Sequence, residues 1–241
     1  MAESKTDGLS RSDVAYRRIR GDILSCRLPP GQRFTERAMA ARLDMSVSPI
    51  RDALTRLDHE GLVRTAPRAG YQVTPLTMKS VDSLFDYWGI LGVEMARRAV
   101  AGANDEQIEL LVGSIVELAQ ISTEGEGTRE VALGWGELAN RPFEIAAEII
   151  DNEYIASAYW QLSGQIKRVW TLVIESELLA AGRRVDSYDD AIRAIRARDV
   201  EAFAEFVRDH LEQSHVRVLR TLARWPSVVT AEVLPLQAAS M

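Results

Sequence analysis

Residues 35–74 read TERAMAARLDMSVSPIRDALTRLDHEGLVRTAPRAGYQVT, and this stretch decides the fold of the first part of the chain. Its spacing of apolar residues predicts two short helices, over about 35–43 and 46–59, with a tight turn between them. Thr35 and Ser46 stand at the N-cap positions, where a side-chain oxygen can accept from backbone N–H groups that lack a helical partner. The stretch therefore predicts a helix-turn-helix.

The flanking residues extend this motif on both sides. A helix is predicted over about 12–25, and the turn Leu28-Pro29-Pro30-Gly31 follows it. After the motif, residues 62–65 and 71–74 predict two strands around the turn at 66–70. The sequence therefore predicts a winged helix-turn-helix domain over residues 10–78, with the motif at about 37–56 and the wing at 62–74.

The second helix of the motif has the residues needed to read DNA. A helix fits the major groove, and its N-terminal residues reach the base edges. Arg51 lies one turn into this helix and could hold O6 and N7 of guanine together, while Arg37 could reach phosphate or a base at the groove edge. Arg68, at the predicted wing tip, suits the minor groove or the backbone. The candidate DNA-binding residues are Arg37, Ser46, Val47, Ser48, Arg51, Arg68 and Gly70, and the expected partner is double-stranded DNA.

The charge of the chain is divided unevenly. Residues 1–78 hold 13 Lys and Arg against 9 Asp and Glu, a net charge of +4, whereas residues 79–241 hold 16 against 26, a net charge of −10. A basic domain on an acidic body is expected where one domain alone meets a polyanion.

Composition excludes several other classes of protein. The 241 residues include a single cysteine, Cys26, which can form neither an internal disulfide nor a multi-cysteine zinc site. The apolar runs fall short of the roughly 18 residues of a membrane helix, and the start MAESKTDGLSRSD has no apolar core of a secretion signal. We therefore expect a cytoplasmic protein with no membrane partner.

From Thr77 onward the pattern is helical throughout, so the chain is mainly α. Short predicted loops favour an antiparallel bundle of six to seven helices over residues 79–224. Asn104 with Gln107 has the spacing of a capping box. Residues 1–9 are expected to be disordered, and residues 225–241 form a tail with no clear period.

The first domain resembles the GntR family of bacterial transcription regulators. The pieces LPPGQRFTER, MAARLDMSVSPIRDALTRL, EGLV and PRAGYQV, within residues 19–76, follow the family's order and spacing. The resemblance implies DNA contacts from Arg37, Arg51 and the wing tip at 68–70. One departure is Val47, where the family often has Arg; either one contact is missing, or Val47 touches a thymine methyl group.

The second part is similar to the FCD effector domain of the FadR-type subfamily, in pieces such as FEIAAEIIDNEYI and AIRARDVEAFAEFVRDHLE. Many FCD domains hold a metal, and the resemblance maps its ligand positions to Asn140, Glu144, Tyr188 and His210. These offer one carboxylate, one imidazole and two poor ligands. We therefore expect no metal or other cofactor, with His210 hydrogen-bonded inside the bundle; a divalent metal at this degenerate site is the alternative.

The resemblance also bears on the ligand of the bundle. FCD domains that bind carboxylate effectors often carry Arg near Ile90 or Leu91, and both residues are apolar here. A cavity near Trp88, Leu91, Trp160 and Trp170 would suit a largely apolar or aromatic ligand; alternatively, these side chains are plain core. The candidate effector-pocket residues are Trp88, Leu91, Asn140, Glu144, Gln161, Arg168, Tyr188 and His210.

Together these observations imply a ligand-responsive transcription regulator, a repressor that binds a pseudo-palindromic operator as a homodimer and is released by a small-molecule effector. The alternative is an effector-independent, architectural DNA-binding protein. An enzyme is not expected, because the chain has no phosphate-cradling glycine loop and no nucleophile elbow.

Overall fold

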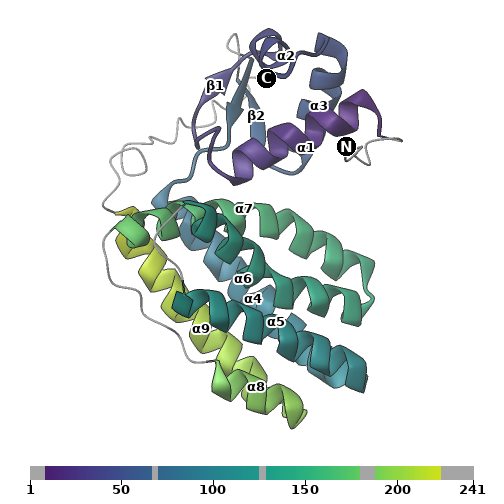
Figure 1. The fold of residues 1–241 in the computed structure, drawn as a ribbon, viewed down its shortest axis with the longest axis vertical. Coiled ribbons are helices and arrows are strands. Elements are labelled where there is room, and N and C mark those ends of the chain that lie inside the picture. The colour runs from purple at the N-terminus through teal and green to yellow at the C-terminus, as the bar shows by residue number, and fades with distance from the viewer. Residues whose placement is uncertain (1–8, 67–69, 125–128, 180–187, 224–241) are drawn as a thin grey trace, which may run out of the picture.

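The computed structural model describes residues 9–66, 70–124, 129–179 and 188–223. A small N-terminal domain, which we call the head (residues 11–74), lies at one end of a helical bundle (residues 78–222), and α7 is the bundle helix that runs beneath it (Figure 1). The mainly α fold with a winged helix-turn-helix followed by a helical bundle is confirmed. The expectations for residues 1–9, apart from Leu9, and for 225–241 fall outside the described residues.

The head contains three helices whose ends follow from local hydrogen bonds. Ser10 and Thr35 cap the first two helices, with their hydroxyl oxygens accepting from the N–H groups three residues on. Ser46 occupies the N-cap position of the third helix, but its side chain makes no capping hydrogen bond. Asp44 adopts φ +53° and ends the second helix. The helices are α1 (Arg11–Leu24), α2 (Glu36–Leu43) and α3 (Val47–His59).

The wing belongs to a three-stranded antiparallel sheet with strand order β1-β3-β2. Its strands are β1 (Arg33–Phe34), β2 (Val63–Ala66) and β3 (Gly70–Val73). The sequence did not predict β1, because two residues show no alternation. Gly70 has φ +82°, and a Cβ there would lie 2.6 Å from the carbonyl oxygen of Phe34. Only glycine lets β3 approach β1 this closely.

The bundle contains six helices within the described residues, which agrees with the prediction of six to seven. Helix α4 packs along α9 and against α6 and α7, while α5 packs against α6 and α8. The capping box of Asn104 and Gln107 is confirmed, because each side chain accepts from the other residue's backbone N–H at 2.9 Å. The helices are α4 (Met78–Gly102), α5 (Asp105–Glu124), α6 (Arg129–Ile150), α7 (Glu153–Leu179), α8 (Asp189–Arg196) and α9 (Val200–Leu222).

Head and bundle each have a hydrophobic core of their own. The head core gathers buried residues from its three helices and its sheet, such as Ile19, Ile50 and Leu57. The bundle core is larger and rich in aromatic side chains. No helix in the described part of the chain is long and apolar enough to cross a membrane.

Candidate DNA-binding surface and bundle cavity

The start of α3 separates into a buried and an exposed side. Pro49 and Ile50 are buried in the head core, and Val47 is half-buried against it. Ser46 and Ser48 are exposed. Ser46 makes no capping bond, and its side chain, like that of Ser48, faces solvent, whereas Val47 is only partly exposed; their contact with DNA stays a prediction.

Arg51 is exposed on α3, and its guanidinium forms a two-pronged ion pair with Glu36 at the start of α2. Nε lies 3.0 Å from Oε1, and Nη2 lies 2.9 Å from Oε2. Hydrogen bonding to Arg51 lowers the pKa of Glu36, and the same bond raises the pKa of Arg51, so both groups are charged at neutral pH. Sequence analysis missed Glu36, because an ion pair between two helices leaves no periodic signal.

The remaining predicted DNA-binding residues differ in their surroundings. Arg37 is exposed and has no ion pair within the described residues. Nearby Arg42 is, by contrast, paired with Asp22 at 2.8 Å. Gly70 has a structural role in the sheet, as described above. Arg68 lies outside the described residues, so its expected contact stays a prediction.

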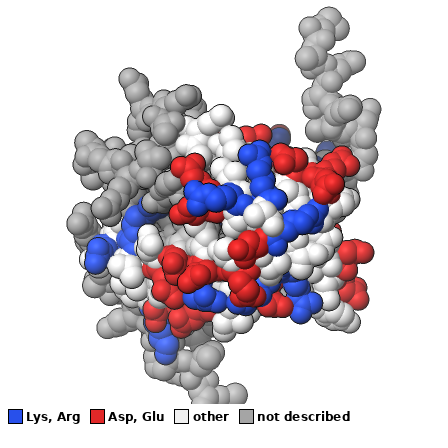
Figure 2. All heavy atoms as spheres, turned by 90° about the horizontal axis from the view of Figure 1, so that it is seen from below, with Lys and Arg blue, Asp and Glu red and all other residues white. Residues whose placement is uncertain are grey.

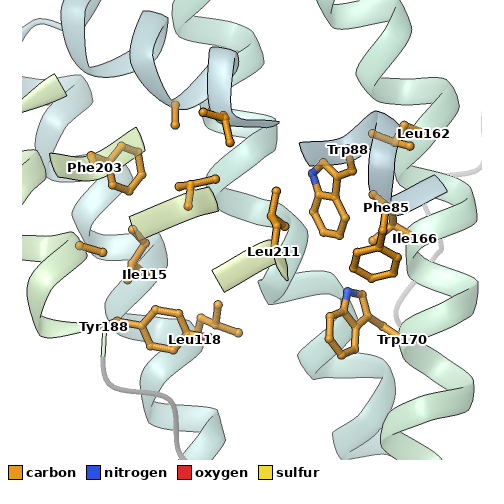
Figure 3. Close-up of a cluster of buried hydrophobic side chains, with 14 of the residues drawn as sticks. Phe85, Trp88, Ile115, Leu118, Leu162, Ile166, Trp170, Tyr188, Phe203 and Leu211 are labelled. Atoms are coloured by element: carbon orange, nitrogen blue, oxygen red, sulfur yellow. The ribbon is translucent and has the colours of Figure 1, made fainter. Parts of the chain in front are cut away.

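The bundle contains a partly open cavity of about 70 Å³. In Figure 3, Leu211 projects between a group that includes Trp88 and Trp170 and a group that includes Tyr188 and Ile115. The wall is almost entirely apolar; its polar groups are on Trp88, Trp170, Tyr188, His210 and Ser214. The volume would hold a few water molecules, because one water needs roughly 10–15 Å³.

One polar atom in the cavity wall is unsatisfied. The indole Nε1 of Trp88 is buried and has no hydrogen-bond partner among the described residues. Gly92, one turn along α4, makes room for this indole, since a Cβ at Gly92 would lie 3.0 Å from the Trp88 ring and 3.2 Å from Phe143. The N–H is therefore a candidate donor to a bound molecule.

The predicted pocket residues fall into two groups. Trp88, Tyr188 and His210 line the cavity, and so does Trp170, whereas Leu91 is not among the lining residues and packs half-buried against the bundle core. The remaining predicted residues, Asn140, Glu144, Gln161 and Arg168, do not line the cavity. Trp160 does not line it either, because its side chain is 47% exposed to solvent.

Those other residues are placed as follows. Asn140 is buried; its amide donates to the carbonyl of Gly136 at 2.7 Å. Glu144 forms an ion pair with Lys167 at 3.3 Å, and Gln161 is exposed. Asn140 and Glu144 are thus engaged by other groups, and the described residues contain no group of three or more His, Cys, Asp and Glu side chains that could hold a metal ion. That the protein binds no metal stays a prediction.

Arg168 was expected in the pocket but faces the head instead. It belongs to a set of three polar side chains on one face of α7 that donate to main-chain carbonyls of the head. The bonds run from Gln165 Nε2 to Gly61 O (2.9 Å), from Thr171 Oγ1 to Leu24 O (3.1 Å) and from Arg168 Nη2 to Thr74 O. The Thr171 hydroxyl also lies 2.9 Å from the carbonyl of Lys167 in its own helix, so its one proton is shared between the two carbonyls. We call this set the α7 contact; the sequence does not reveal it, because the helical pattern does not show which element covers a face.

The Arg168 side chain is fully buried in this contact, with 0% of its surface exposed. Burial lowers the pKa of Arg168 to about 10, so the group is still cationic at neutral pH. Its other amino group donates to the Gln165 side chain at 2.7 Å. A buried cation needs such partners, because an unpaired one is costly to desolvate.

The end of the bundle opposite the head offers no comparable DNA surface. Seen from below, acidic and basic side chains intermingle on this face and do not form a patch of one sign (Figure 2). This face therefore gives no sign of a second DNA-binding surface.

A winged helix-turn-helix with exposed serines and arginines on its second motif helix, joined to a helical bundle with an internal cavity, defines a transcription regulator. The comparisons with known proteins agree. Residues 11–73 match the family described as bacterial regulatory proteins of the gntR family, and residues 83–213 match the FCD domain. The chain belongs to the GntR family, in the branch with an FCD effector-binding domain.

Named relatives fit this assignment. The chain is 24% identical to the HTH-type transcriptional repressor RspR of Escherichia coli over 82% of this chain and 84% of that protein. It is 27% identical to the HTH-type regulator YdhC of Bacillus subtilis over about half of each (48% and 52%). The solved structure of E. coli McbR/YncC has the same fold, with a TM-score of 0.69 and 17% identity over 89% of this chain and 99% of that one.

Proposed function

We propose that the protein is a repressor that binds a pseudo-palindromic operator as a homodimer and is released by a small, largely apolar effector bound in the bundle cavity. The observation that carries this proposal is the position of α7. Trp170 on this helix lines the cavity, and Arg168, two residues earlier, contacts the head. Two residues correspond to roughly 200° around a helix, so Trp170 and Arg168 lie on nearly opposite sides of α7. One rigid helix therefore contacts both the cavity and the head.

The size of the cavity supports a coupled movement. At about 70 Å³ it is smaller than the roughly 150 Å³ engineered apolar cavity that takes up benzene. A ligand with more than a few heavy atoms must therefore displace part of the wall, and Trp170 belongs to that wall. Displacement of α7 would reorient the head, and coupling of this kind is typically about 1–3 kcal/mol, or roughly 5–150-fold in affinity.

The chemistry of the wall favours an apolar ligand with one hydrogen-bond acceptor. Most of the lining side chains are aliphatic or aromatic, and no charged carboxylate or guanidinium is among them. The unpartnered N–H of Trp88 would donate to the acceptor. A ligand that left this group unsatisfied would bind less tightly.

Dimer formation and repression have separate support. One helix reads only a few base pairs, so two heads are needed for useful specificity, and a twofold dimer matches a palindromic site. Repression is suggested by the name of RspR, a transcriptional repressor. The relatives are named as regulators, so we propose no catalytic activity, and we propose that the protein acts on DNA in the cytoplasm. Light scattering that finds a monomer at micromolar concentration, with and without DNA, would contradict the dimer.

The test starts with an operator selected from random DNA and a screen of small apolar metabolites for compounds that raise the melting temperature, as a ligand of the folded state must. Hits should weaken operator binding at least 5-fold. In the variant Ala96→Leu, which fills the cavity from α4, both effects should disappear while operator binding remains. Ala101→Leu, at an exposed position of the same helix, is the control and should respond like the wild type.

An effector-independent architectural protein is the competing function. For an architectural protein, we expect either that no compound raises the melting temperature or that the compounds which do so leave the affinity for operator unchanged. The architectural function would be excluded by a ligand that releases the wild-type protein from the operator but has no effect on Ala96→Leu.

A further inference from the structure

Glu36 occupies one particular edge of the Arg51 guanidinium. The carboxylate accepts from Nε and from Nη2, at 3.0 Å and 2.9 Å, which are the two N–H groups along the side of the guanidinium. The outer end of the guanidinium, formed by Nη1 and the second N–H of Nη2, makes no hydrogen bond to Glu36. Arginine can grip guanine through two parallel N–H groups, so only this outer end remains for a base.

Glu36 is the more firmly held partner of the pair. It is the first residue of α2, next to the N-cap Thr35, and a carboxylate at this end of a helix is favoured by the helix dipole. Its side chain is 22% exposed, compared with 63% for Arg51. The long arginine side chain is therefore fixed against a shorter side chain that the fold already positions.

We propose that Glu36 is a positioning residue that sets the base specificity of the head by presenting Arg51 end-on to the major groove. Fixing the guanidinium before binding reduces the entropy lost when it meets guanine. The carboxylate also repels phosphate, which weakens binding wherever Arg51 finds no guanine. Glu36 therefore increases discrimination and decreases binding to random DNA; the inference rests on the proposed role of Arg51 in reading a base.

The test compares variants on DNA selected by the wild-type protein from a random duplex library. Affinity is measured for the selected site, for the site with each guanine replaced, and for random duplex. Glu36→Gln should lower discrimination at one guanine at least 5-fold and tighten binding to random duplex 2-fold or more. Asp58→Asn, which removes the same charge from an exposed position on α3, should leave discrimination unchanged.

A second variant separates geometry from charge. Glu36→Asp keeps the negative charge but withdraws the carboxylate by one carbon, so discrimination should fall without tighter binding to random duplex. This variant also serves if Glu36→Gln folds poorly, which melting curves would show. Discrimination that is unchanged in both variants overturns the proposal.

A double-mutant cycle distinguishes this inference from the proposed function. Arg51→Ala alone should abolish the preference for the same guanine, and adding Glu36→Gln should change it no further, because the pair acts as a unit. If Arg51→Ala leaves every base preference intact, the base-reading role of Arg51 is wrong. If Arg51→Ala abolishes the preference but Glu36→Gln does not reduce it, the role of Glu36 is wrong.

Discussion

Arg168, on α7 of the bundle, donates a hydrogen bond to the main-chain carbonyl of Thr74, the residue that follows the last strand of the head. The donor is a buried cation whose hydrogen bonds, among the described residues, go to the Thr74 carbonyl and the Gln165 amide oxygen, while its Nε is buried without a partner there. The head is therefore held by a charged group whose desolvation is offset by carbonyl and amide oxygens. A bond of this kind resists partial loosening, because exposing only one partner leaves the other unsatisfied.

The variant Arg168→Met tests the strength of this contact. It keeps a long side chain but leaves the Thr74 carbonyl without this donor, so we expect the free energy of unfolding to fall by about 1–3 kcal/mol. Urea unfolding measures the change. Arg141→Met removes a half-exposed arginine from α6 and should change stability by no more than about 0.5 kcal/mol. Equal losses in both variants would contradict the prediction.

Two glycine substitutions should have opposite effects on stability. Gly70→Ala places a methyl group 2.6 Å from a backbone oxygen at positive φ, and we expect a loss of about 1–3 kcal/mol. Gly113→Ala lies within α5, where a Cβ would meet nothing within 4 Å, and should gain about 0.5–1 kcal/mol from higher helix propensity. Thermal unfolding of the two proteins gives both signs in one experiment.

The sequence predicted several helices well, because they are marked by both an apolar stripe and a cap. Thr35 and Asn104 illustrate this, since both side chains cap the helices predicted to begin there. It did not predict contacts between elements. Glu36 and Arg168 each find their partners on another element, and no periodicity in one helix reveals what the fold places against it.

The candidate effector site was predicted only in part, because the sequence does not reveal which helices pack together around the cavity. Trp88, Tyr188 and His210 lie on the cavity wall. Trp88 was expected there as one of the aromatic side chains of the bundle, and Tyr188 and His210 because the resemblance to the FCD domain maps ligand positions to them. Gln161 and Arg168 share α7 with the cavity residue Trp170 but lie on other faces of the helix. Assigning polar residues to a pocket requires knowing which face is inward, and a helix buried on several sides does not show this in its sequence.

The purified protein should contain well below one equivalent of divalent metal per chain. Glu144 is paired with Lys167, and His210 packs against the rings of Tyr188 and Phe206 at 5.7 and 5.9 Å between centroids. Elemental analysis after purification without chelator measures the content. About one zinc, nickel or manganese ion per chain, lost in His210→Ala, would show that the degenerate site still binds metal.

Arg37→Ala should weaken binding to operator and to random duplex by similar factors. Arg37 is exposed without an ion pair in the described structure, so it is suited to a phosphate contact. Loss of one such contact should make the slope of log affinity against log salt shallower by about 1. Arg56→Ala is the control, because Arg56 is already paired with Asp13 at 2.8 Å and should leave the slope unchanged. A selective loss on operator alone would assign Arg37 to a base.

The three bonds of the α7 contact all end on carbonyl oxygens of the peptide backbone in the head. Every amino acid carries that oxygen, so the attachment does not depend on which side chains the head presents at those positions. Substitutions elsewhere on the head can therefore alter the recognised base sequence while leaving this attachment to the bundle intact. Such an arrangement lets operator preference and ligand preference diverge separately in evolution, and it makes this chain a suitable starting point for exchanging reading heads between regulators.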